Sequence, residues 1–158
     1  MKYLNLGCGD RKIKKCINID SREECNPDLV CDIKYLPCDP DSIDGIYALD
    51  VLEHIPRSLV LPTLESWYRI LKGGGFLIIR MPNIRSISKR YLKGIIDAKE
   101  FSRLIFGGQE ENDFANFHKS GFDKRTLSKL LKHIGFKKLK EYKEISCNYN
   151  NMLLEFEK

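Results

Sequence analysis

The chain has 158 residues, of which 42% are hydrophobic and 31% are charged, and its formal net charge is +5 at pH 7. This length and balance predict a single domain with one core, over residues 1–158, and exclude a disordered chain. No apolar run reaches the roughly 20 residues that a membrane-spanning helix needs, and Met1-Lys2 leads into a strand-like segment without a signal sequence. We therefore expect a cytoplasmic protein whose modest positive charge permits an acidic ligand without requiring one.

The first strand-like segment, Lys2 to Leu6, ends in a glycine turn. Gly7-Cys8-Gly9 follows it and would place backbone N–H groups at the carboxyl end of a strand, where α/β sheets bind ligands. A dinucleotide turn needs a third glycine, but Lys12 stands at that position, and no Gly-Lys-Ser/Thr motif is present. We therefore expect a ligand other than a dinucleotide or a nucleoside triphosphate.

Three further strand-like segments follow, at Cys16 to Ile19, Asp28 to Ile33 and Ile43 to Leu49. The connections between the first three strands are shorter than the roughly dozen residues of a usual parallel crossover, so they must be loops or single turns. Asn5 and Asn18 also put amides where a fully buried strand would carry aliphatic side chains. These features predict that helices are reduced on one face of the sheet. That face is then partly wet or is covered by a second copy of the chain, and we expect a homodimer.

The middle of the chain alternates between helical and strand-like patterns. Ser58 to Leu71 has helical periodicity, and Gly73-Gly74-Gly75 is expected to end that helix. Phe76 to Met81 is strongly apolar, which predicts a central strand buried on both faces. Ile84 to about Ala98 predicts a weaker helix, and Phe101 to Phe122 is expected to be irregular.

The last part of the chain predicts a helix and a hairpin. Asp123 can cap a helix that runs to His133. Lys137 to Ile145 and Asn151 to Glu157 predict an antiparallel pair that turns at Asn148 to Asn150. Strands separated by crossovers and followed by an antiparallel pair are typical of an α/β fold on a mostly parallel sheet.

Acidic residues stand at the ends of the second and third strands. Asp20 ends the second strand, where a carboxylate can accept hydrogen bonds from both hydroxyls of a ribose. Asp32 ends the third strand, where a carboxylate could accept a hydrogen bond from the exocyclic amine of a base. Each acid could instead cap a turn. Read together, the glycine turn and these acids describe a nucleoside laid across the strand ends, and the acid-rich mouth suits a cationic group on that nucleoside.

The six cysteines give no sign of a metal site. They are Cys8, Cys16, Cys25, Cys31, Cys38 and Cys147. No pair has the two-residue gap of a zinc knuckle, so we expect free thiols and no metal.

An ordered set of motifs resembles a known family. The motifs are Leu4 to Asp10, Asn18-Ile19-Asp20, Asp32-Ile33 with Leu36-Pro37, Asp44-Gly45-Ile46-Tyr47, Val51-Leu52-Glu53-His54, Arg69 to Gly75 and Gly121-Phe122-Asp123. In this order they resemble a class I S-adenosylmethionine-dependent methyltransferase of the small "methyltransferase type 11" kind. The resemblance implies a Rossmann-like, doubly wound, mostly parallel seven-stranded sheet in the order 3-2-1-4-5-7-6, with strand 7 antiparallel.

The resemblance also implies a cofactor and its binding residues. The methyl donor would be S-adenosyl-L-methionine, and the product would be S-adenosyl-L-homocysteine. The glycine turn would contact the methionine end of the cofactor, Asp20 the ribose, and Asp32-Ile33 the adenine, while Leu49 and Asp50 would flank the sulfonium. The expected cofactor-binding residues are Gly7, Cys8, Gly9, Asp20, Asp32, Ile33 and Leu49.

Methyl transfer from a sulfonium is an in-line displacement that depends on positioning, and a hydroxyl or ammonium acceptor also needs a base. His118 lies in the irregular, Gly- and Asn-rich segment and is the first candidate, because an imidazole titrates near neutral pH. Asp50 and His54 are the alternatives. His118 could instead brace a loop, and His54 could be buried and satisfied. Phe106 to Gln109 could form part of an acceptor pocket or lid.

We therefore expect methyl transfer to an O or N atom of a small-molecule or glycan/lipid acceptor. The alternative is a non-catalytic S-adenosylmethionine-binding module that supports a partner protein. A polar pocket around His118 and Asp50 would favour the enzyme, and an apolar surface there would favour the module. We expect no nucleic-acid substrate, because the basic segment Arg85 to Lys93 is typical of a solvated helix face and no Asn-Pro-Pro-Tyr motif follows the fourth strand.

Overall fold

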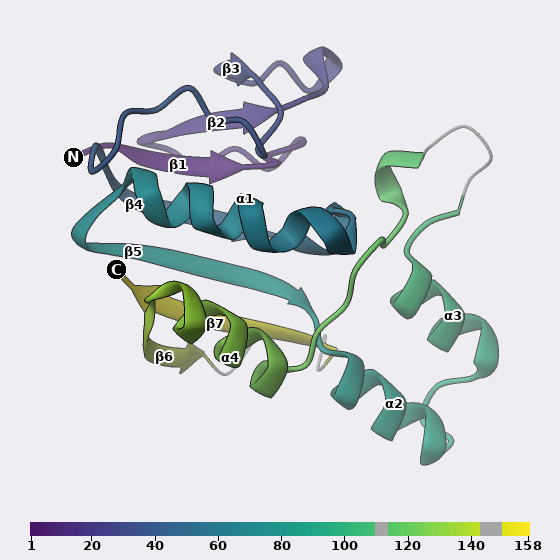
Figure 1. Ribbon diagram of the computed structural model, residues 1–158. Coiled ribbons are helices and arrows are strands. Elements are labelled where there is room, and N and C mark those ends of the chain that lie inside the picture. Colours follow the sequence, from purple (N-terminus) through teal and green to yellow (C-terminus); the bar gives the residue numbers. More distant parts are fainter. Residues whose placement is uncertain (110–113, 143–149) are drawn as a thin grey trace.

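The computed structural model describes residues 1–109, 114–142 and 150–158 (Figure 1). Its strands are β1 (Tyr3–Leu6), β2 (Cys16–Asp20), β3 (Leu29–Val30), β4 (Ile43–Leu49), β5 (Leu71–Pro82), β6 (Lys137–Tyr142) and β7 (Asn151–Glu157). They form one seven-stranded sheet in the order β3-β2-β1-β4-β5-β7-β6. β1 to β5 pair in parallel, whereas β7 is antiparallel to both β5 and β6. The predicted fold class is therefore confirmed.

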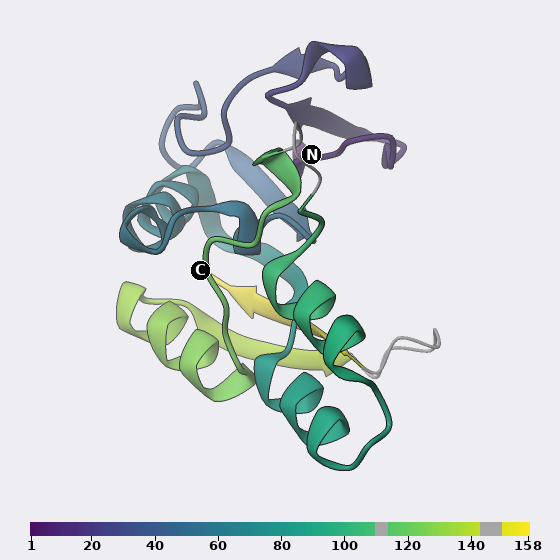
Figure 2. The same cartoon turned by 90° about the vertical axis from the view of Figure 1, so that its right-hand side faces the viewer.

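The helices lie in two groups. They are α1 (Arg57–Ile70), α2 (Ile84–Leu92), α3 (Ala98–Phe106) and α4 (Lys124–Ile134), with short 3-10 turns η1 (Glu23–Cys25), η2 (Leu52–His54) and η3 (Phe114–Asn116). α1 and α4 cover the same face of the sheet, and α2 and α3 lie beyond its end (Figures 1 and 2). None of the helices in the described residues has the length and apolar character needed to cross a bilayer.

The core lies between the sheet and the α1–α4 layer. Alternate residues of β4, β5 and β7 and most residues of β1 are buried on this side, and α1 and α4 supply the facing side chains. The buried set includes Leu4, Leu6, Ile46, Ala48, Leu77, Ile79, Leu154 and Phe156 from the sheet and Leu64, Trp67, Leu127 and Leu131 from the helices. Burying this apolar surface is the main favourable term in folding.

The opposite face of the sheet is thinly covered, as the short connections predict. The links from β1 to β2 and from β2 to β3 hold only loop and the turn η1. Two buried amides brace the first loop, because Asn5 Nδ2 donates to Asn18 Oδ1 at 2.9 Å and Asn18 Oδ1 also accepts from the Ile13 N–H at 2.8 Å. The amides that the sequence places in these strands therefore hold the connection that stands in for a helix.

β5 differs from its prediction in two ways. It begins at Leu71, because that residue already has extended backbone (φ −68°, ψ 140°), so Gly73-Gly74-Gly75 belongs to the strand and does not end α1. It is also not buried on both faces, since Phe76 and Ile78 point to the open side and are only half-buried. The apolar run in β5 therefore has one buried face and one face that no helix of the described residues covers.

The segment after β5 also differs from its prediction. A single helix from Ile84 to Ala98 was expected, but α2 ends at Leu92 and Gly94 turns with φ +66°. Asp97 then caps α3 by accepting from the Glu100 N–H at 2.8 Å. The stretch expected to be irregular therefore contains most of α3 as well as η3.

The remaining elements match their predictions closely, except that the third strand is only Leu29–Val30. Asp123 caps α4 in a capping box with Thr126. β6 and β7 form the expected antiparallel pair. Residues 143–149, which include the end of the predicted strand to Ile145 and most of the predicted turn at Asn148 to Asn150, lie outside the described residues.

Gly45 gives a test of packing on the open face. A Cβ at Gly45 would lie 2.3 Å from the ring of Phe76, whose centroid is 5.4 Å from that of Tyr47. We expect Gly45→Ala to lower the free energy of unfolding by about 1–3 kcal/mol, because the aromatic ring must move. Gly73→Ala, whose Cβ would meet nothing within 4 Å, should change it by less than about 0.5 kcal/mol. Urea unfolding measures both, and equal values would contradict the packing account.

Candidate functional site

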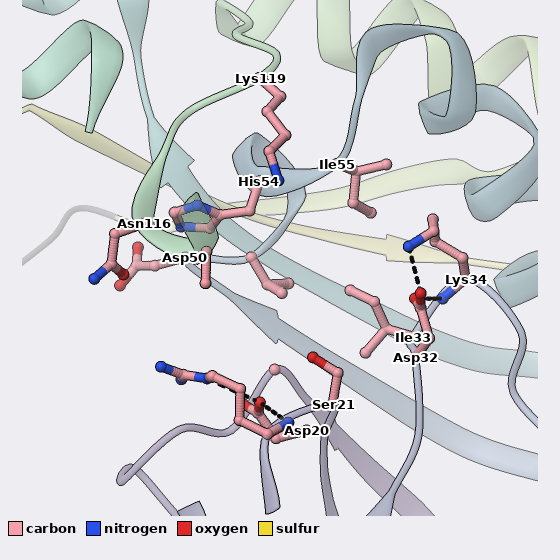
Figure 3. Close-up of a pocket in the computed structure, with 14 residues that line it drawn as sticks. Asp20, Ser21, Asp32, Ile33, Lys34, Asp50, His54, Ile55, Asn116 and Lys119 are labelled. Atoms are coloured by element: carbon pink, nitrogen blue, oxygen red, sulfur yellow. Dashed lines mark hydrogen bonds and ion pairs between the residues drawn. The ribbon is translucent and has the colours of Figure 1, made fainter. Parts of the chain in front are cut away.

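A cavity of about 300 Å³ opens at the carboxyl ends of β1, β2 and β4 (Figure 3). Its walls come from the glycine turn, from the residues after β2, β3 and β4, and from the segment that follows α3. The lining residues are Gly7, Asp20, Ser21, Arg22, Asp32, Ile33, Lys34, Asp50, Val51, His54, Ile55, Ala115, Asn116 and Lys119. Segments far apart in the sequence therefore meet where parallel sheets bind their ligands.

The glycine turn passes directly against the residue after Asp50. Gly7 has φ +60°, and a Cβ there would lie 2.3 Å from Val51 Cγ2. Only glycine fits this position, and its bare backbone forms part of the cavity wall. Cys8 points away into the core and, like the other four cysteines of the described residues, is a free thiol. Burial raises the pKa of Cys8, and the negative charge of Asp20 raises it further by a smaller amount.

The Asp20 carboxylate ties the glycine turn to the end of β2. Its oxygens accept from the Gly9 N–H at 2.8 Å, from the Arg22 N–H at 3.0 Å and from Arg22 Nε at 3.2 Å. Burial alone would raise the pKa of Asp20, but these hydrogen bonds outweigh it and hold the pKa below its ordinary value. A carboxylate offers about four lone-pair positions, so the ionised group can still accept from a ligand in the cavity.

The opposite wall is built from the residues after β3. Asp32 accepts from the Lys34 N–H at 3.0 Å and forms an ion pair with Lys34 Nζ. Trp67 of α1 donates from Nε1 to the Ile33 carbonyl at 2.9 Å, so the core helix fixes this loop. Burial would raise the pKa of Asp32, but the hydrogen bonds and charge of Lys34 lower it overall. The side chain is therefore an ionised acceptor at the cavity wall.

Asp50 separates this cavity from a second one. It has φ +57°, a conformation that residues other than glycine rarely adopt, and its N–H donates to the Arg80 carbonyl at 2.8 Å. Arg80 Nε donates to Asp50 Oδ1 at 2.9 Å, Arg80 Nη2 pairs with Oδ2, and Arg11 Nη1 lies 3.3 Å from Oδ2. Two guanidinium groups therefore fix the Asp50 carboxylate.

The second cavity, of about 390 Å³, is predominantly polar. It is lined by Arg11, Asp50, Glu53, His54, Pro82, Arg103, Leu104, Gly107, Gly108, Asn116, His118 and Asn151. His54 and His118 face each other there, with ring centroids 5.1 Å apart and planes at 71°. Burial lowers the pKa of both imidazoles, against the raising effect of hydrogen bonds to backbone carbonyls.

Glu53 is a buried acid in the lining of this second cavity. It is 2% exposed, and within the described part of the chain its Oε2 atom has no hydrogen-bond partner. Burial raises its pKa to about 8. Its backbone carbonyl accepts from the N–H groups of Lys119 and Ser120 at 2.7 and 3.0 Å, which pins the segment after α3 over the strand ends.

The predicted site residues divide into three groups. Gly7, Asp20, Asp32, Ile33, Asp50 and His54 share the first cavity. His118 joins Asp50 and His54 in the second cavity, together with Gly107 and Gly108 of the predicted pocket segment. Among the described residues of the prediction, Cys8, Gly9 and Leu49 line neither cavity.

The sequence reasoning missed several residues of the site. They are Arg22, Lys34, Glu53, Arg80 and Asn116. Arg22 and Lys34 each follow a predicted acid by two positions, a local signal that could have found them. Glu53, Arg80 and Asn116 have no such signal, because only the tertiary fold brings Glu53 and Asn116 to the cavities and Arg80 to Asp50.

Gly7 and Gly94 separate backbone strain from steric exclusion at the cavity wall. Both have positive φ, but a Cβ at Gly94 would meet nothing within 4 Å. We expect Gly94→Ala to lower the free energy of unfolding by about 1–2 kcal/mol from strain alone. Gly7→Ala should lose about 1–3 kcal/mol more, because its Cβ collides with Val51.

Adding Val51→Ala tests the source of that extra loss. In the Gly7→Ala background it should recover part of the stability, which a double-mutant cycle in urea measures as a coupling energy. Equal losses at Gly7 and Gly94, or no coupling to Val51, would show that the turn is not packed as described.

Sequence comparison links the chain to one domain family. Residues 13–79 match the family model described as "Methyltransferase domain". A sequence search of curated proteins gives no match.

Structural comparison extends the likeness to the whole chain. A SAM-dependent methyltransferase from Methanosarcina mazei superposes with a TM-score of 0.73 and 18% identity, covering 99% of this chain and 92% of that chain. The 1,6-didemethyltoxoflavin-N1-methyltransferase from Burkholderia thailandensis, with bound S-adenosylhomocysteine, gives a TM-score of 0.67 at 13% identity over 99% and 70% of the two chains.

A chain from the Haloferax volcanii complex of the Trm112 methyltransferase activator with a methyltransferase also superposes. It gives a TM-score of 0.67 at 15% identity over 99% of this chain and 81% of that chain. The resemblance is thus confirmed: residues 13–79 match a methyltransferase-domain model, and the chain has the fold of class I S-adenosylmethionine-dependent methyltransferases, whose cofactor is S-adenosylmethionine.

Proposed function

We propose that the protein transfers a methyl group from S-adenosylmethionine to an O or N atom of a small-molecule or glycan/lipid acceptor. One observation carries this proposal: the first cavity brings Gly7, Asp20 and Asp32 together at adjacent strand ends, and a second, polar cavity adjoins it through Asp50 and His54. A nucleoside donor and a polar acceptor each have a place in such an arrangement.

The first cavity fits the nucleoside part of the cofactor. Gly7 lets the ligand approach bare backbone where any Cβ would collide with Val51. Asp20 keeps lone pairs free for ribose hydroxyls, and Asp32 with the adjacent Ile33 backbone would hold the adenine. The bound cofactor would supply an electrophilic methyl group on a cationic sulfur.

The second cavity supports an enzyme over a non-catalytic module. Its lining is polar around His118 and Asp50, whereas a module that only supports a partner would present an apolar surface there. His54 and His118 are the proposed acceptor-side residues, because both imidazoles can accept a hydrogen bond from an acceptor hydroxyl or amine. Asp50 is proposed as a positioning residue, since Arg80 and Arg11 already engage its carboxylate.

Two of the structural neighbours bear on the acceptor and on partners. The Burkholderia thailandensis protein binds 1,6-didemethyltoxoflavin, a small molecule, which supports a small acceptor here. The Haloferax volcanii complex contains a methyltransferase activator, which makes a protein partner of this chain worth testing. Neither neighbour identifies the acceptor atom.

Calorimetry with S-adenosylhomocysteine tests the cofactor site. Asp20→Ala should weaken binding by about 1–3 kcal/mol, roughly 5- to 150-fold, because hydrogen bonds to the ribose are lost. Asp44→Ala is the matched control, since Asp44 is also ion-paired, to Lys72 at 2.8 Å, but lies at the opposite end of β4. Circular dichroism confirms that each variant is folded. Wild-type affinity in Asp20→Ala would refute the site assignment.

Catalysis is tested separately. The protein is mixed with S-adenosylmethionine and a panel of small hydroxyl and amine acceptors, and the release of S-adenosylhomocysteine is measured. His118→Ala should retain affinity for S-adenosylhomocysteine but lose methyl transfer to an acceptor that the wild-type protein methylates. Equal loss of binding and transfer would assign His118 to the cofactor side instead.

The open face of the sheet supports a homodimer. Tyr3, Tyr47, Phe76, Ile78 and Leu153 are half-buried on it, and no helix of the described residues covers them. We expect light scattering to give twice the 18.4 kDa chain mass. Ile78→Lys should give the monomer, because a charge on this face opposes its burial.

Leu92→Lys is the control for that measurement, since Leu92 is 82% exposed on α2, away from the open face. It should leave the dimer intact. A monomeric wild-type chain would contradict the proposal.

A further inference from the structure

Glu53, His54 and His118 bring three ligand-type atoms together. One ligand atom from each residue lies within 4.8 Å of the others. Glu53 and His54 come from η2, and His118 comes from the segment after α3, so main-chain hydrogen bonds make the cluster. The Lys119 N–H donates to the Glu53 carbonyl at 2.7 Å, and the His118 N–H donates to the Phe106 carbonyl at 2.9 Å. The backbone therefore holds the three side chains at one place.

Each of the two imidazoles is oriented by a hydrogen bond from its own Nδ1 to a backbone carbonyl. His54 Nδ1 lies 3.2 Å from the Phe117 carbonyl oxygen, and His118 Nδ1 lies 3.2 Å from the Ile105 carbonyl oxygen. Because a carbonyl oxygen only accepts, each Nδ1 must carry the proton. In the neutral rings each Nε2 then keeps a free lone pair. Histidines that bind metals are fixed in this way, with the other ring nitrogen donating to a backbone carbonyl or a carboxylate.

One oxygen of the Glu53 carboxyl lacks a partner in the described part of the chain. The residue is 2% exposed, and Oε2 has no hydrogen-bond partner among the described residues. Leaving a buried oxygen unsatisfied is costly unless a proton or a cation meets it. With the proton on Nδ1, each Nε2 is an acceptor, so the cluster offers two imidazole nitrogens and one unsatisfied carboxyl oxygen as ligand-type atoms.

We propose that Glu53, His54 and His118 bind one divalent transition-metal ion, such as Zn²⁺, Fe²⁺ or Co²⁺, beside the methyl-donor cavity. Two imidazole nitrogens and one carboxylate oxygen are a typical ligand set for such ions. The three ligand-type atoms lie within 4.8 Å of one another, and metal–ligand distances of about 2.0–2.2 Å require them to move closer together around the ion. Three protein ligands leave coordination positions open toward the cavity.

The charges around the cluster are compatible with a cation. Asp50 lies in the same cavity and adds a second carboxylate, while Arg11 and Arg103 also line it. Because Arg80 and Arg11 already engage Asp50, the charge that compensates an ion at the cluster would come from Glu53, ionised on metal binding. The sequence reasoning expected no metal because it considered only cysteine spacing, and His118 lies far from Glu53-His54 in the chain.

The role of the ion rests on the proposed function, whereas its binding does not. An acceptor hydroxyl in an open coordination position would lose its proton to solvent more readily. The resulting oxygen would attack the donor methyl carbon, forming the O–C bond as the C–S bond breaks and the sulfonium electron pair returns to sulfur. The products are the methyl ether, S-adenosylhomocysteine and the released proton.

Metal titration of the full chain tests the site. The protein is stripped with a chelator, and Co²⁺ is added while its visible absorption is recorded and, separately, while the heat of binding is measured. We expect one Co²⁺ per chain, with absorption typical of nitrogen and oxygen ligands. Thiolate-to-cobalt charge-transfer absorption as the only signal would place the ion on cysteines and overturn the proposal.

Three variants localise the ion. Glu53→Gln and His118→Gln should each weaken Co²⁺ binding at least tenfold, and Glu53→Gln keeps the shape of the buried side chain without its charge. His133→Gln is the matched control, because the third histidine of the chain lies in the last turn of α4 and outside the cluster. Equal affinity in Glu53→Gln and the wild type, or an equal loss in His133→Gln, would refute the site.

Asp20→Ala separates this inference from the proposed function. It should lose affinity for S-adenosylhomocysteine and keep Co²⁺ affinity. Thermal unfolding with and without Co²⁺ gives an independent reading, since an ion that binds only the folded chain must raise the midpoint of the wild type and of His133→Gln. No rise in the wild type would contradict the proposal even if a variant failed to fold.

Discussion

The carboxylate of Asp20 holds together the part of the site that has no helix behind it. In a doubly wound sheet, a crossover helix usually supports the turn after the first strand. Here the link from β1 to β2 is a loop. Asp20 accepts hydrogen bonds from Gly9 in the glycine turn and from Arg22 after β2, and so fixes these two segments of the cavity wall. Asn5 and Asn18 brace the other side of the same loop. Buried hydrogen bonds therefore do the positioning that packing does elsewhere.

The acceptor side depends on a different constraint, the attachment of the segment after α3 to η2. The Glu53 carbonyl accepts two N–H groups from that segment, and so His118 is brought opposite His54. The first cavity, the proposed donor site, is thus built mainly from neighbouring strand ends, whereas the second cavity, the proposed acceptor site, needs two segments that lie far apart in the sequence. Changes in the segment after α3 can alter the acceptor side while the sheet stays intact.

This difference explains what the sequence could predict. β2, β4, β7 and α4 have local signals, namely apolar alternation, caps and glycines, and the acids at the strand ends follow from parallel pairing. The division of the helix after β5 was missed because Asp97 competes as a cap within one periodic run. The half-open face of β5 was missed because an apolar run does not show whether a helix covers both sides. The placement of His118 near Glu53 depends on tertiary hydrogen bonds, from Lys119 and Ser120 to the Glu53 carbonyl, and has no local signal.

Asp50 and His54 line both cavities, and this shared wall constrains the chemistry. In the proposed reaction the acceptor atom, the methyl carbon and the sulfur lie on one line, so the methyl group would pass where the two cavities meet. Asp50 stands there with φ +57°, a strained conformation that its N–H bond to the Arg80 carbonyl and its pairing with the Arg80 side chain maintain. In the proposed reaction this conformation would place a carboxylate beside the path of a methyl group that leaves a cationic sulfur, and Arg80 and Arg11 hold that carboxylate in one orientation.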